Sequence, residues 1–489
     1  MIKGNKMKKI FVTLLIFVTL LILNQLSLFS KSKDECYNCH SNMLEDKPGK
    51  SYSGDLHFLL GISCSNCHGG NNKSDDYEIA MSKKNGFIGV PPKDKIVDIC
   101  LNCHLNQKTM AKYGSKKSVK HLEFFKKSVH YKQGVATCIT CYGIHNIKKV
   151  NNPKSPVYPT KEVKLCSKCH SDANYMKTYN PELPTDQYEK YLTSIHGIKN
   201  SKGDTKTATC SDCHSPHNIF SPKDPRASVY ATNVPKTCSK CHSNANYMKD
   251  YHIPTDQFEK YSKSVHGIQL LKKHDVSAPA CNDCHGNHGA VPVGVKSISH
   301  VCGTCHALNA DLFSKSPHSK PFKNKNIPQC ETCHSNHLIT HPTDDMLGVN
   351  KGSVCIKCHN NKRDKGYLAA LYMKSHIDSV LSKKVLADSL LSEAENLGMD
   401  VSDYIYSLKD FNQNLIEARR ITHKSNLKDF KSALAKTSNI VNNAILAGNS
   451  SIDNYYFRRW GLVAATFIIT LLVIVLFWKI KKLDKKKNL

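Results

Sequence analysis

Residues 166–217 read CSKCHSDANYMKTYNPELPTDQYEKYLTSIHGIKNSKGDTKTATCSDCHSPH. The stretch opens with one CxxCH motif and closes with another. A lone histidine, His196, lies between them, and a trailing histidine, His217, lies three residues past the closing motif. Nearly the same text returns at 238–288. More divergent copies follow the same plan at 36–70, 100–145 and 302–337, and a single motif stands at 355–359. The cysteine-bearing chain is therefore a series of repeats.

All 22 cysteines fall into CxxC pairs, and histidine directly follows ten of the eleven pairs. Two thiols at this spacing form thioethers to the two vinyl groups of one porphyrin, and the next histidine can then bind the iron. Structural zinc would need four ligands, and disulfides would not require the histidines. We expect haem c at these pairs: Cys36 and Cys39, Cys64 and Cys67, Cys100 and Cys103, Cys138 and Cys141, Cys166 and Cys169, Cys210 and Cys213, Cys238 and Cys241, Cys281 and Cys284, Cys302 and Cys305, Cys330 and Cys333, Cys355 and Cys358.

Histidine supplies enough candidates for the iron ligands, because the chain has 26 of them. The expected proximal ligands directly follow the motifs: His40, His68, His104, His170, His214, His242, His285, His306, His334 and His359. The lone histidines are expected distal ligands: His57, His130, His196, His266, His318 and His376. Trailing histidines are expected to bind a neighbouring haem: His217, His288 and His337. A surface role is the alternative for any of them, and six histidines have no repetition behind them: His121, His252, His274, His300, His341 and His423.

The net charge of +29 does not indicate a nucleic-acid partner. Four lysines lie in residues 1–30, and the tail 479–489 carries six lysines and one aspartate. Each haem would bring two propionates, so eleven of them leave the rest of the chain close to neutral. We therefore expect no nucleic acid among the partners.

Both ends of the chain carry apolar runs flanked by lysine. Residues 1–30 predict an export signal or, because no clear cleavage site follows, an N-terminal anchor. Residues 460–478 hold no charge and are bracketed by the only two tryptophans. As a helix they would span about 28 Å, which predicts one transmembrane helix. The basic tail 479–489 predicts a cytoplasmic C-terminus, so the haem domain is expected on the periplasmic side of the inner membrane.

The organisation between the two ends follows from composition. Residues 31–363 are expected to form the multihaem domain, with five paired repeats and one further haem carried on loops and short helices. Apolar residues recur at helical spacing over residues 364–455, with a break at Gly398. We expect at least two long antiparallel helices there, packed on the last haems. The predicted fold class is mainly α and irregular.

The paired CxxCH motifs, the CxxCHxxH closings and the Ser-x-His-Gly segments resemble multihaem c-type cytochromes of the doubled-CxxCH type. The resemblance covers about residues 36–376 and implies closely stacked haems with mostly bis-histidine ligation, which carry electrons in anaerobic respiration. The long C-terminal helices and anchor are similar in layout to the hydroxylamine oxidoreductase and multihaem nitrite reductase group. Electron carriers of this kind imply redox-protein partners. The predicted membrane tether adds the membrane and, as a further candidate, quinol, and from it we expect transport between the quinone pool and periplasmic proteins.

One closing motif breaks the rule, because Tyr142 stands where the others have histidine. In enzymes of the resembled group, a non-histidine ligand often marks the catalytic haem, and phenolate is a known ligand of haem iron. Tyr142 and His145 are therefore candidate catalytic residues of an oxidoreductase acting on a small nitrogen or sulfur compound. Three alternatives stay open: another histidine binds this iron, the site is a degenerate haem site, or Cys138 and Cys141 form a disulfide. The haem count is ten, or eleven if this pair is occupied.

Overall fold

The computed structural model describes residues 34–44, 47–115, 120–292 and 298–487. The predicted signal or anchor at 1–30 lies outside these ranges. Within them the chain is helical and irregular and contains no strand, which confirms the predicted fold class. The chain divides into two compact units: unit 1 holds Met1–Thr255 and His274–Pro292, and unit 2 holds Asp256–Lys273 and Val293–Leu489.

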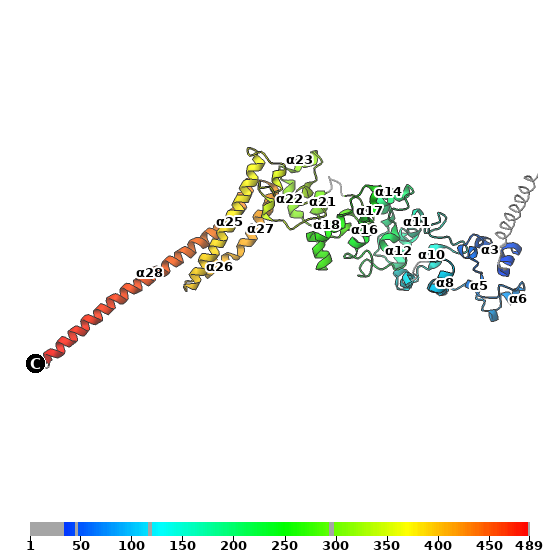
Figure 1. Cartoon of the computed structure of the whole chain (residues 1–489), viewed down its shortest axis with the longest axis horizontal. Helices are drawn as coiled ribbons and strands as arrows, with labels where there is room; N and C mark the ends of the chain where they lie inside the picture. The colour runs from blue at the N-terminus through cyan, green and yellow to red at the C-terminus, as the bar shows by residue number, and fades with distance from the viewer. Residues whose placement is uncertain (1–33, 45–46, 116–119, 293–297, 488–489) are drawn as a thin grey trace, which may run out of the picture. The chain divides into compact units, whose positions relative to one another are not determined.

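Unit 1 is built from short helices joined by loops (Figure 1). They are α2 (Glu35–Tyr37), η1 (Asn38–Met43), α3 (Lys47–Tyr52), α4 (Leu56–Leu59), α5 (Ser65–His68), α6 (Tyr77–Ala80), η2 (Lys83–Asn85), α7 (Lys93–His104), α8 (Gln107–Lys112), η3 (Lys120–Lys127), α9 (Val129–Lys132), α10 (Cys138–Tyr142), α11 (Pro159–His170), α12 (Ala173–Tyr179), α13 (Gln187–Thr193), α14 (Ile195–Ser201), α15 (Cys210–His214), α16 (Val234–His242), α17 (Ala245–Met248), η4 (Lys249–Tyr251) and α20 (Cys281–His285). Few apolar side chains are fully buried among them, so the cofactors have to supply much of the buried apolar volume.

Unit 2 begins with similar short helices and ends in much longer ones. The short elements are α18 (Gln257–Lys263), α19 (Val265–Gly267), η5 (Ile268–Lys272), α21 (Ile298–Gly303), α22 (Ala307–Ser314), α23 (Ser319–Asn324), α24 (Gln329–His334), η6 (Asp344–Met346) and η7 (Cys355–Lys357). The C-terminal part consists of α25 (Lys365–Asn396), α26 (Ser402–Ser407), α27 (Lys409–Ile421), η8 (Thr422–Lys424) and α28 (Leu427–Lys487).

The boundaries of α25 follow from its terminal residues. The Asp364 side chain accepts a hydrogen bond from the Gly366 N–H at 3.2 Å and so caps the first turn. At the other end the chain leaves the helix through Gly398, whose φ of +77° lies in the left-handed region that glycine adopts without strain. The predicted helix break at Gly398 is therefore confirmed.

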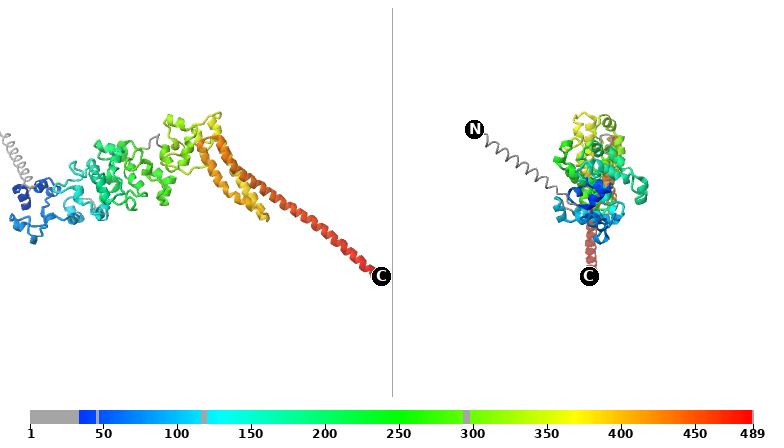
Figure 2. Two further views of the ribbon diagram at one scale, coloured as in Figure 1. Left: turned by 180° about the vertical axis from the view of Figure 1, so that it is seen from behind. Right: turned by 90° about the vertical axis from the view of Figure 1, so that its right-hand side faces the viewer.

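The two longest helices, α25 and α28, pack along each other in the same direction. Tyr372 contacts Phe430, with ring centroids 6.5 Å apart, and Lys383 donates a hydrogen bond to Asn442 at 3.1 Å. The residue numbers of the contacting pairs rise together along both helices, so α25 and α28 run parallel. The expected antiparallel arrangement is therefore wrong for these two helices. The antiparallel member is the shorter α27, which returns the chain between them (Figures 1 and 2).

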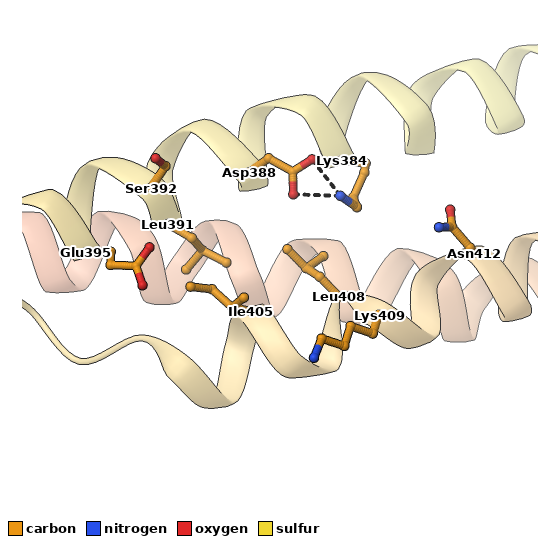
Figure 3. A pocket seen from close by; sticks show the side chains of 9 residues that line it. All are labelled: Lys384, Asp388, Leu391, Ser392, Glu395, Ile405, Leu408, Lys409 and Asn412. Atoms are coloured by element: carbon orange, nitrogen blue, oxygen red, sulfur yellow. Dashed lines mark hydrogen bonds and ion pairs between the residues drawn. The ribbon is translucent and has the colours of Figure 1, made fainter.

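This helical bundle contains the main apolar core of unit 2. Phe411, Leu415, Phe430 and Val441 are almost completely buried between α25, α27 and α28. A cavity of about 410 Å³ opens on the side of the bundle between α25 and the α26–α27 segment (Figure 3). Its lining mixes ion pairs with aliphatic side chains and contains none of the predicted site residues.

The C-terminal half of α28 leaves the bundle with its apolar side chains exposed. Its most apolar window has a mean hydropathy of 2.7, and it is the one described helix that is long and apolar enough to cross a membrane. The predicted span at 460–478 lies within it. The helix is continuous from Leu427 to Lys487, so no loop separates the bundle from this apolar segment.

Replacing Phe430 with alanine tests the packing of the bundle. Its ring is 0% exposed, so the cavity left behind should lower the free energy of unfolding by about 3–5 kcal/mol. Leu446→Ala is the matched control on the same helix, because Leu446 is 67% exposed and should change stability by less than about 0.5 kcal/mol. Urea unfolding followed by far-UV circular dichroism measures both. Equal effects of the two variants would contradict the packing described.

Candidate haem sites

The cysteine motifs lie on helices that present their side chains together. In the second, third and fourth repeats the opening motif ends a longer helix, respectively α7, α11 and α16. The closing motifs form short helices of their own, which begin at or beside the first cysteine: α5, α10, α15, α20 and α24. Cysteines three residues apart share one helix face, and the following residue lies next to them. This arrangement suits attachment to one porphyrin edge.

The opening and closing motifs of a repeat meet through their first cysteines. The Sγ atoms of Cys166 and Cys210 lie within 4.8 Å of each other, and both are close to a carboxylate oxygen of Glu162. The same thiol contact recurs in three other repeats: Cys100 with Cys138, Cys238 with Cys281, and Cys302 with Cys330. Porphyrins attached at two such motifs would therefore start from neighbouring points.

The second cysteine of each motif is placed differently from the first. Every first cysteine is half-buried, whereas most second cysteines are exposed. The exposed ones are Cys67, Cys103, Cys213, Cys284, Cys305, Cys333 and Cys358, and the half-buried ones are Cys39, Cys141, Cys169 and Cys241. The outer thiol of a motif is therefore generally open to an approaching porphyrin. Attachment of haem at these thiols stays a prediction.

Some second cysteines face the second cysteine of an adjoining motif. Cys103 interacts electrostatically with Cys67, Cys169 with Cys141, and Cys358 with Cys333. Each of these contacts joins the opening motif of one repeat, or the single last motif, to the closing motif before it. Within each unit, the predicted attachment points joined by these contacts are therefore neighbours in space as well as along the chain.

Three further second cysteines contact residues close by in the sequence. Cys39 and Cys284 interact electrostatically with the first cysteines of their own motifs, Cys36 and Cys281. The Oγ1 atom of Thr304 lies 3.9 Å from Sγ of Cys305. In the motifs of Cys39 and Cys284 both thiols therefore lie close together, as attachment to one porphyrin requires.

Histidine rings come together in pairs from different repeats. Five pairs contain the histidine of an opening motif or of the single last motif, which we group with the opening motifs: His57 with His104 at 6.1 Å, His130 with His170 at 5.9 Å, His196 with His242 at 6.2 Å, His266 with His306 at 6.2 Å, and His318 with His359 at 5.9 Å between centroids. Three contain the histidine of a closing motif: His68 with His145 at 5.9 Å, His214 with His288 at 6.0 Å, and His334 with His423 at 6.0 Å.

The spacing of these rings fits an iron ion between them. A bond from a metal ion to an imidazole nitrogen is about 2 Å long, so two rings bound on opposite sides of one ion have centroids about 6 Å apart. The observed pairs match that separation. Burial, and then the neighbouring ring, lowers the pKa of His130 and of His214 to about 4. Both rings are therefore neutral at physiological pH, as metal-binding imidazole must be.

The pairing follows one rule along the chain. A lone histidine pairs with the opening motif of the next repeat, as His196 of the third repeat does with His242 of the fourth. A trailing histidine pairs with the closing motif of the preceding repeat, as His288 of the fourth does with His214 of the third. A repeat with both kinds of histidine therefore offers one forward and one backward, whereas the first repeat has no trailing histidine.

Several ring nitrogens are held by a second partner on the side away from the pair. Nδ1 of His57 lies 2.9 Å from Oδ1 of Asp55, and Nδ1 of His68 lies 2.7 Å from the carbonyl oxygen of Gly89. His359 makes a short hydrogen bond to Asp364 through the same atom. Such bonds place the proton on Nδ1 and turn the Nε2 lone pair toward the partner ring.

Four lone histidines, His57, His130, His196 and His266, sit at the starts of short helices capped by a buried aspartate or serine. Ser194 Oγ accepts from the Gly197 N–H at 2.9 Å and donates to the Tyr191 carbonyl at 2.6 Å. Ser128 and Ser264 make the corresponding pairs of bonds. The capping residue, two positions before each of these four histidines, fixes the backbone that carries the ring.

The position after the lone histidine in the third and fourth repeats requires glycine for a steric reason. A Cβ atom on Gly197 would meet the Tyr191 carbonyl oxygen at 2.0 Å, and one on Gly267 would meet that of Tyr261 at 1.9 Å. No side chain fits at such distances, so the Ser-x-His-Gly segment requires glycine at its last position.

Tyr142 occupies the place of a closing-motif histidine and faces His217. Its Oη lies 3.0 Å from Nε2 of His217, within hydrogen-bond distance. Burial, and then the thiol of Cys141, raises the pKa of Tyr142 to about 12, so the phenol stays neutral. Two ligand atoms on opposite sides of one iron would be about 4 Å apart, so at their observed separation these two atoms cannot both bind the same iron.

Two predicted site residues lie elsewhere than expected. His145, predicted to act with Tyr142, is paired with His68 instead. His376, predicted to be a distal ligand, stacks on Tyr372 with centroids 3.6 Å apart, and its Nδ1 lies 2.9 Å from the carbonyl oxygen of that residue. The i,i+4 spacing within α25 brings these two rings together.

Three further predicted ligands, His40, His285 and His337, lie within or next to the helices that carry their motifs. His40 lies in η1 of the first repeat, and His285 ends α20, with Nδ1 3.2 Å from the carbonyl oxygen of Val291. His337 follows α24, and its N–H donates to Asn336 Oδ1 at 2.6 Å. All 22 cysteines lie within the described residues and none forms a disulfide, so the disulfide alternative for Cys138 and Cys141 is wrong.

Sequence repetition missed His423, which lies in η8 between α27 and α28 and faces His334. Counting the histidines available to each motif would have found it. The closing motif at Cys330 and Cys333 needs a trailing histidine from a following repeat, and the single motif at 355–359 has none. A histidine from the helical region is then the remaining candidate for this position.

Comparisons with known proteins agree with this arrangement. The doubled CXXCH motif family matches residues 203–247, the cytochrome c3 family matches 56–171, and the cytochrome c554 and c-prime family matches 23–69. Over these segments the chain is similar to multihaem c-type cytochromes. It is also similar to the multiheme cytochrome MtrA of Shewanella baltica (strain OS185). The two are 22% identical over 335 residues, which cover 65% of this chain and 81% of the relative. No solved structure matches the cytochrome.

Gly197→Ala tests the close approach behind the lone histidine of the third repeat. Because the added methyl group would overlap the Tyr191 carbonyl, the segment carrying His196 must shift, and we expect a loss of stability of about 2 kcal/mol or more. The low-spin spectrum of one haem should change with it. Gly352→Ala is the control, because nothing lies within 4 Å of its added Cβ. Thermal unfolding and visible spectra measure both. An unchanged Gly197→Ala protein would contradict the assignment.

Proposed function

We propose that this cytochrome is a membrane-anchored electron carrier of anaerobic respiration, with its haems on the periplasmic side of the inner membrane. The observation that carries the proposal is the recurring pair of histidine rings about 6 Å apart. An iron bound by both rings has no free position for a substrate, and two histidines hold its potential lower than a histidine and a methionine would. Such haems pass electrons and do not make bonds.

The order of the motifs in space supports conduction within each unit. In unit 1 the thiol of Cys141 interacts electrostatically with that of Cys166, and the thiol of Cys213 with that of Cys238. In unit 2 the thiol of Cys333 interacts electrostatically with that of Cys355 in the same way. Consecutive repeats thus approach each other at the closing motif of one and the opening motif of the next. Together with the contacts inside repeats, these approaches form a series of short steps.

The anchor supports the proposed location. The apolar part of α28 is long enough to span a bilayer, and the lysine-rich tail that follows favours a cytoplasmic end. Haem c is attached outside the cytoplasm, which agrees with this orientation. Along α28, the distance from Leu427 to Trp460 is about 50 Å. We therefore propose that a redox protein partner carries electrons from the quinone pool in the membrane across this distance to the haems.

Mass spectrometry of the full-length cytochrome, followed by a redox titration, tests the proposal. We expect a mass excess of eleven haem groups, low-spin spectra for all haems except that on Cys138 and Cys141, and low midpoint potentials. The variant Cys138→Ala/Cys141→Ala should lose one haem and leave the low-spin set unchanged. A protein with fewer than ten haems, or with mostly high-spin haems, would contradict an electron carrier of this design.

A second candidate function rests on the contact between Tyr142 and His217. Because their ligand atoms are only 3.0 Å apart, an iron carried by Cys138 and Cys141 can bind one of them and not both. The haem there would have one face open to a small nitrogen or sulfur compound such as nitrite or hydroxylamine. The residue left unbound, phenol or imidazole, is then placed beside that face as a hydrogen-bonding group.

Tyr142→His tests this second function. The wild-type cytochrome should show one high-spin haem whose spectrum changes when hydroxylamine or nitrite is added. The variant should gain a second imidazole, convert that haem to low spin and lose the response. Tyr179→His is the control, because Tyr179 is 44% exposed and lies outside the motif. If the wild-type protein is entirely low-spin and does not respond, the enzyme function is excluded and the electron carrier remains.

A further inference from the structure

The segments that carry lone and trailing histidines are joined by a backbone hydrogen bond, which we call the ligand bridge. In each case the residue before a lone histidine donates its N–H to the carbonyl two residues past the trailing histidine of the next repeat. The four bridges are Leu56 to Ile147 at 2.8 Å, Val129 to Ile219 at 2.9 Å, Ile195 to Ala290 at 3.1 Å, and Val265 to Ile339 at 2.8 Å. The ligand candidates for two different motifs are thereby fixed to each other.

The fifth repeat departs from this pattern in an informative way. Its lone histidine, His318, follows Pro317, which has no N–H to donate. The corresponding contact is made by Ser425, whose Oγ lies 3.3 Å from Nδ1 of His318. Ser425 is two residues past His423, the same offset that the bridging carbonyls have from the trailing histidines. The turn between α27 and α28 thus occupies the place of a trailing segment, although it is far away in sequence.

Ring orientation separates the two classes of histidine pair and assigns His423 to one of them. Pairs that contain an opening-motif histidine are inclined by 38° to 88°. Pairs that contain a closing-motif histidine are nearly parallel, at 28° for His68 with His145 and 10° for His214 with His288. The angle between His334 and His423 is 16°, which falls within the closing-motif class.

The remaining contacts of His423 prepare its ring for binding. Nδ1 lies 2.9 Å from the carbonyl oxygen of Arg420, an acceptor that fixes the proton on Nδ1. The Nε2 lone pair then points across the gap toward His334.

We infer that His423 is the second axial ligand of the haem iron on Cys330 and Cys333 and that the α27–α28 turn is the last ligand segment of the series. The inference rests on the proposed attachment of haem at this motif. The helical region at 364–455 would then bind a cofactor in addition to linking the haem domain to the apolar segment of α28. His376, by contrast, is not a ligand.

Replacing His423 with alanine in the full-length holoprotein tests the inference. We expect one haem to change from low spin to high spin and to acquire the ability to bind added imidazole. The lost electron paramagnetic resonance signal should be of the rhombic kind that nearly parallel imidazole planes produce. His376→Ala and His341→Ala are controls and should leave the number of low-spin haems unchanged.

A second variant separates ligation from a structural role. In His423→Met the thioether should keep the iron six-coordinate, and the midpoint potential of that one haem should rise, because a histidine and methionine pair raises it. A residue that merely packs in the turn would not shift one potential in this way. The background Cys330→Ala/Cys333→Ala should lack that haem, and adding His423→Ala to it should change no further signal.

The outcomes distinguish the inference from the function it rests on. If mass spectrometry shows no haem at Cys330 and Cys333, the proposed attachment fails. If the haem is present and low-spin, and His423→Ala leaves it low-spin, the ligand assignment alone is overturned. Loss of the low-spin signal in His376→Ala instead would also overturn it. Far-UV circular dichroism of each variant shows whether the bundle remains folded.

Discussion

The need for two imidazoles on opposite faces of one iron organises this chain. A CxxCH motif supplies only the ligand on its own side, so the second must come from another segment, about 6 Å away between ring centroids. Here it comes from a neighbouring repeat, and the ligand bridge ties two such segments together. With few fully buried apolar side chains in unit 1, these links between repeats replace the continuous core that an ordinary domain would have.

Most of the candidate haem site residues could be predicted from the sequence, because they recur in short local motifs. The motif spacing identified the candidate attachment cysteines, and the recurrence of lone and trailing histidines selected most of the rings that the structure pairs. The reading failed where tertiary structure acts over long distances. His376 matched the spacing of a lone histidine, but it lies within α25, where Tyr372 one turn earlier covers its ring. His423 lacked every local sign, because the folding of three long helices brings it to His334. Periodicity likewise predicted the helices but not that α25 and α28 run in parallel.

Tyr142 shows how one substitution changes the chemistry of a repeated site. At the equivalent positions imidazole faces imidazole with space for an ion, whereas here a neutral phenol reaches His217 directly. The longer side chain brings the two atoms too close together for both of them to bind one iron. Because the surrounding helix and both cysteines follow the common plan, the difference is confined to coordination. A conducting series and a reactive centre are thus compatible with one scaffold.

The exchange of ligands between neighbours has an evolutionary consequence. A repeat that gives one histidine forward and takes another from behind has complementary ends, so an in-frame duplication of the whole segment recreates both partnerships without any compensating mutation. The blocks shared by residues 166–217 and 238–288, such as CSKCHS, ANYMK and PTDQ, are what such an event would leave. Growth by copying can then extend the reach of the molecule one repeat at a time. Only the final copy needs a special solution, and the helical region provides it.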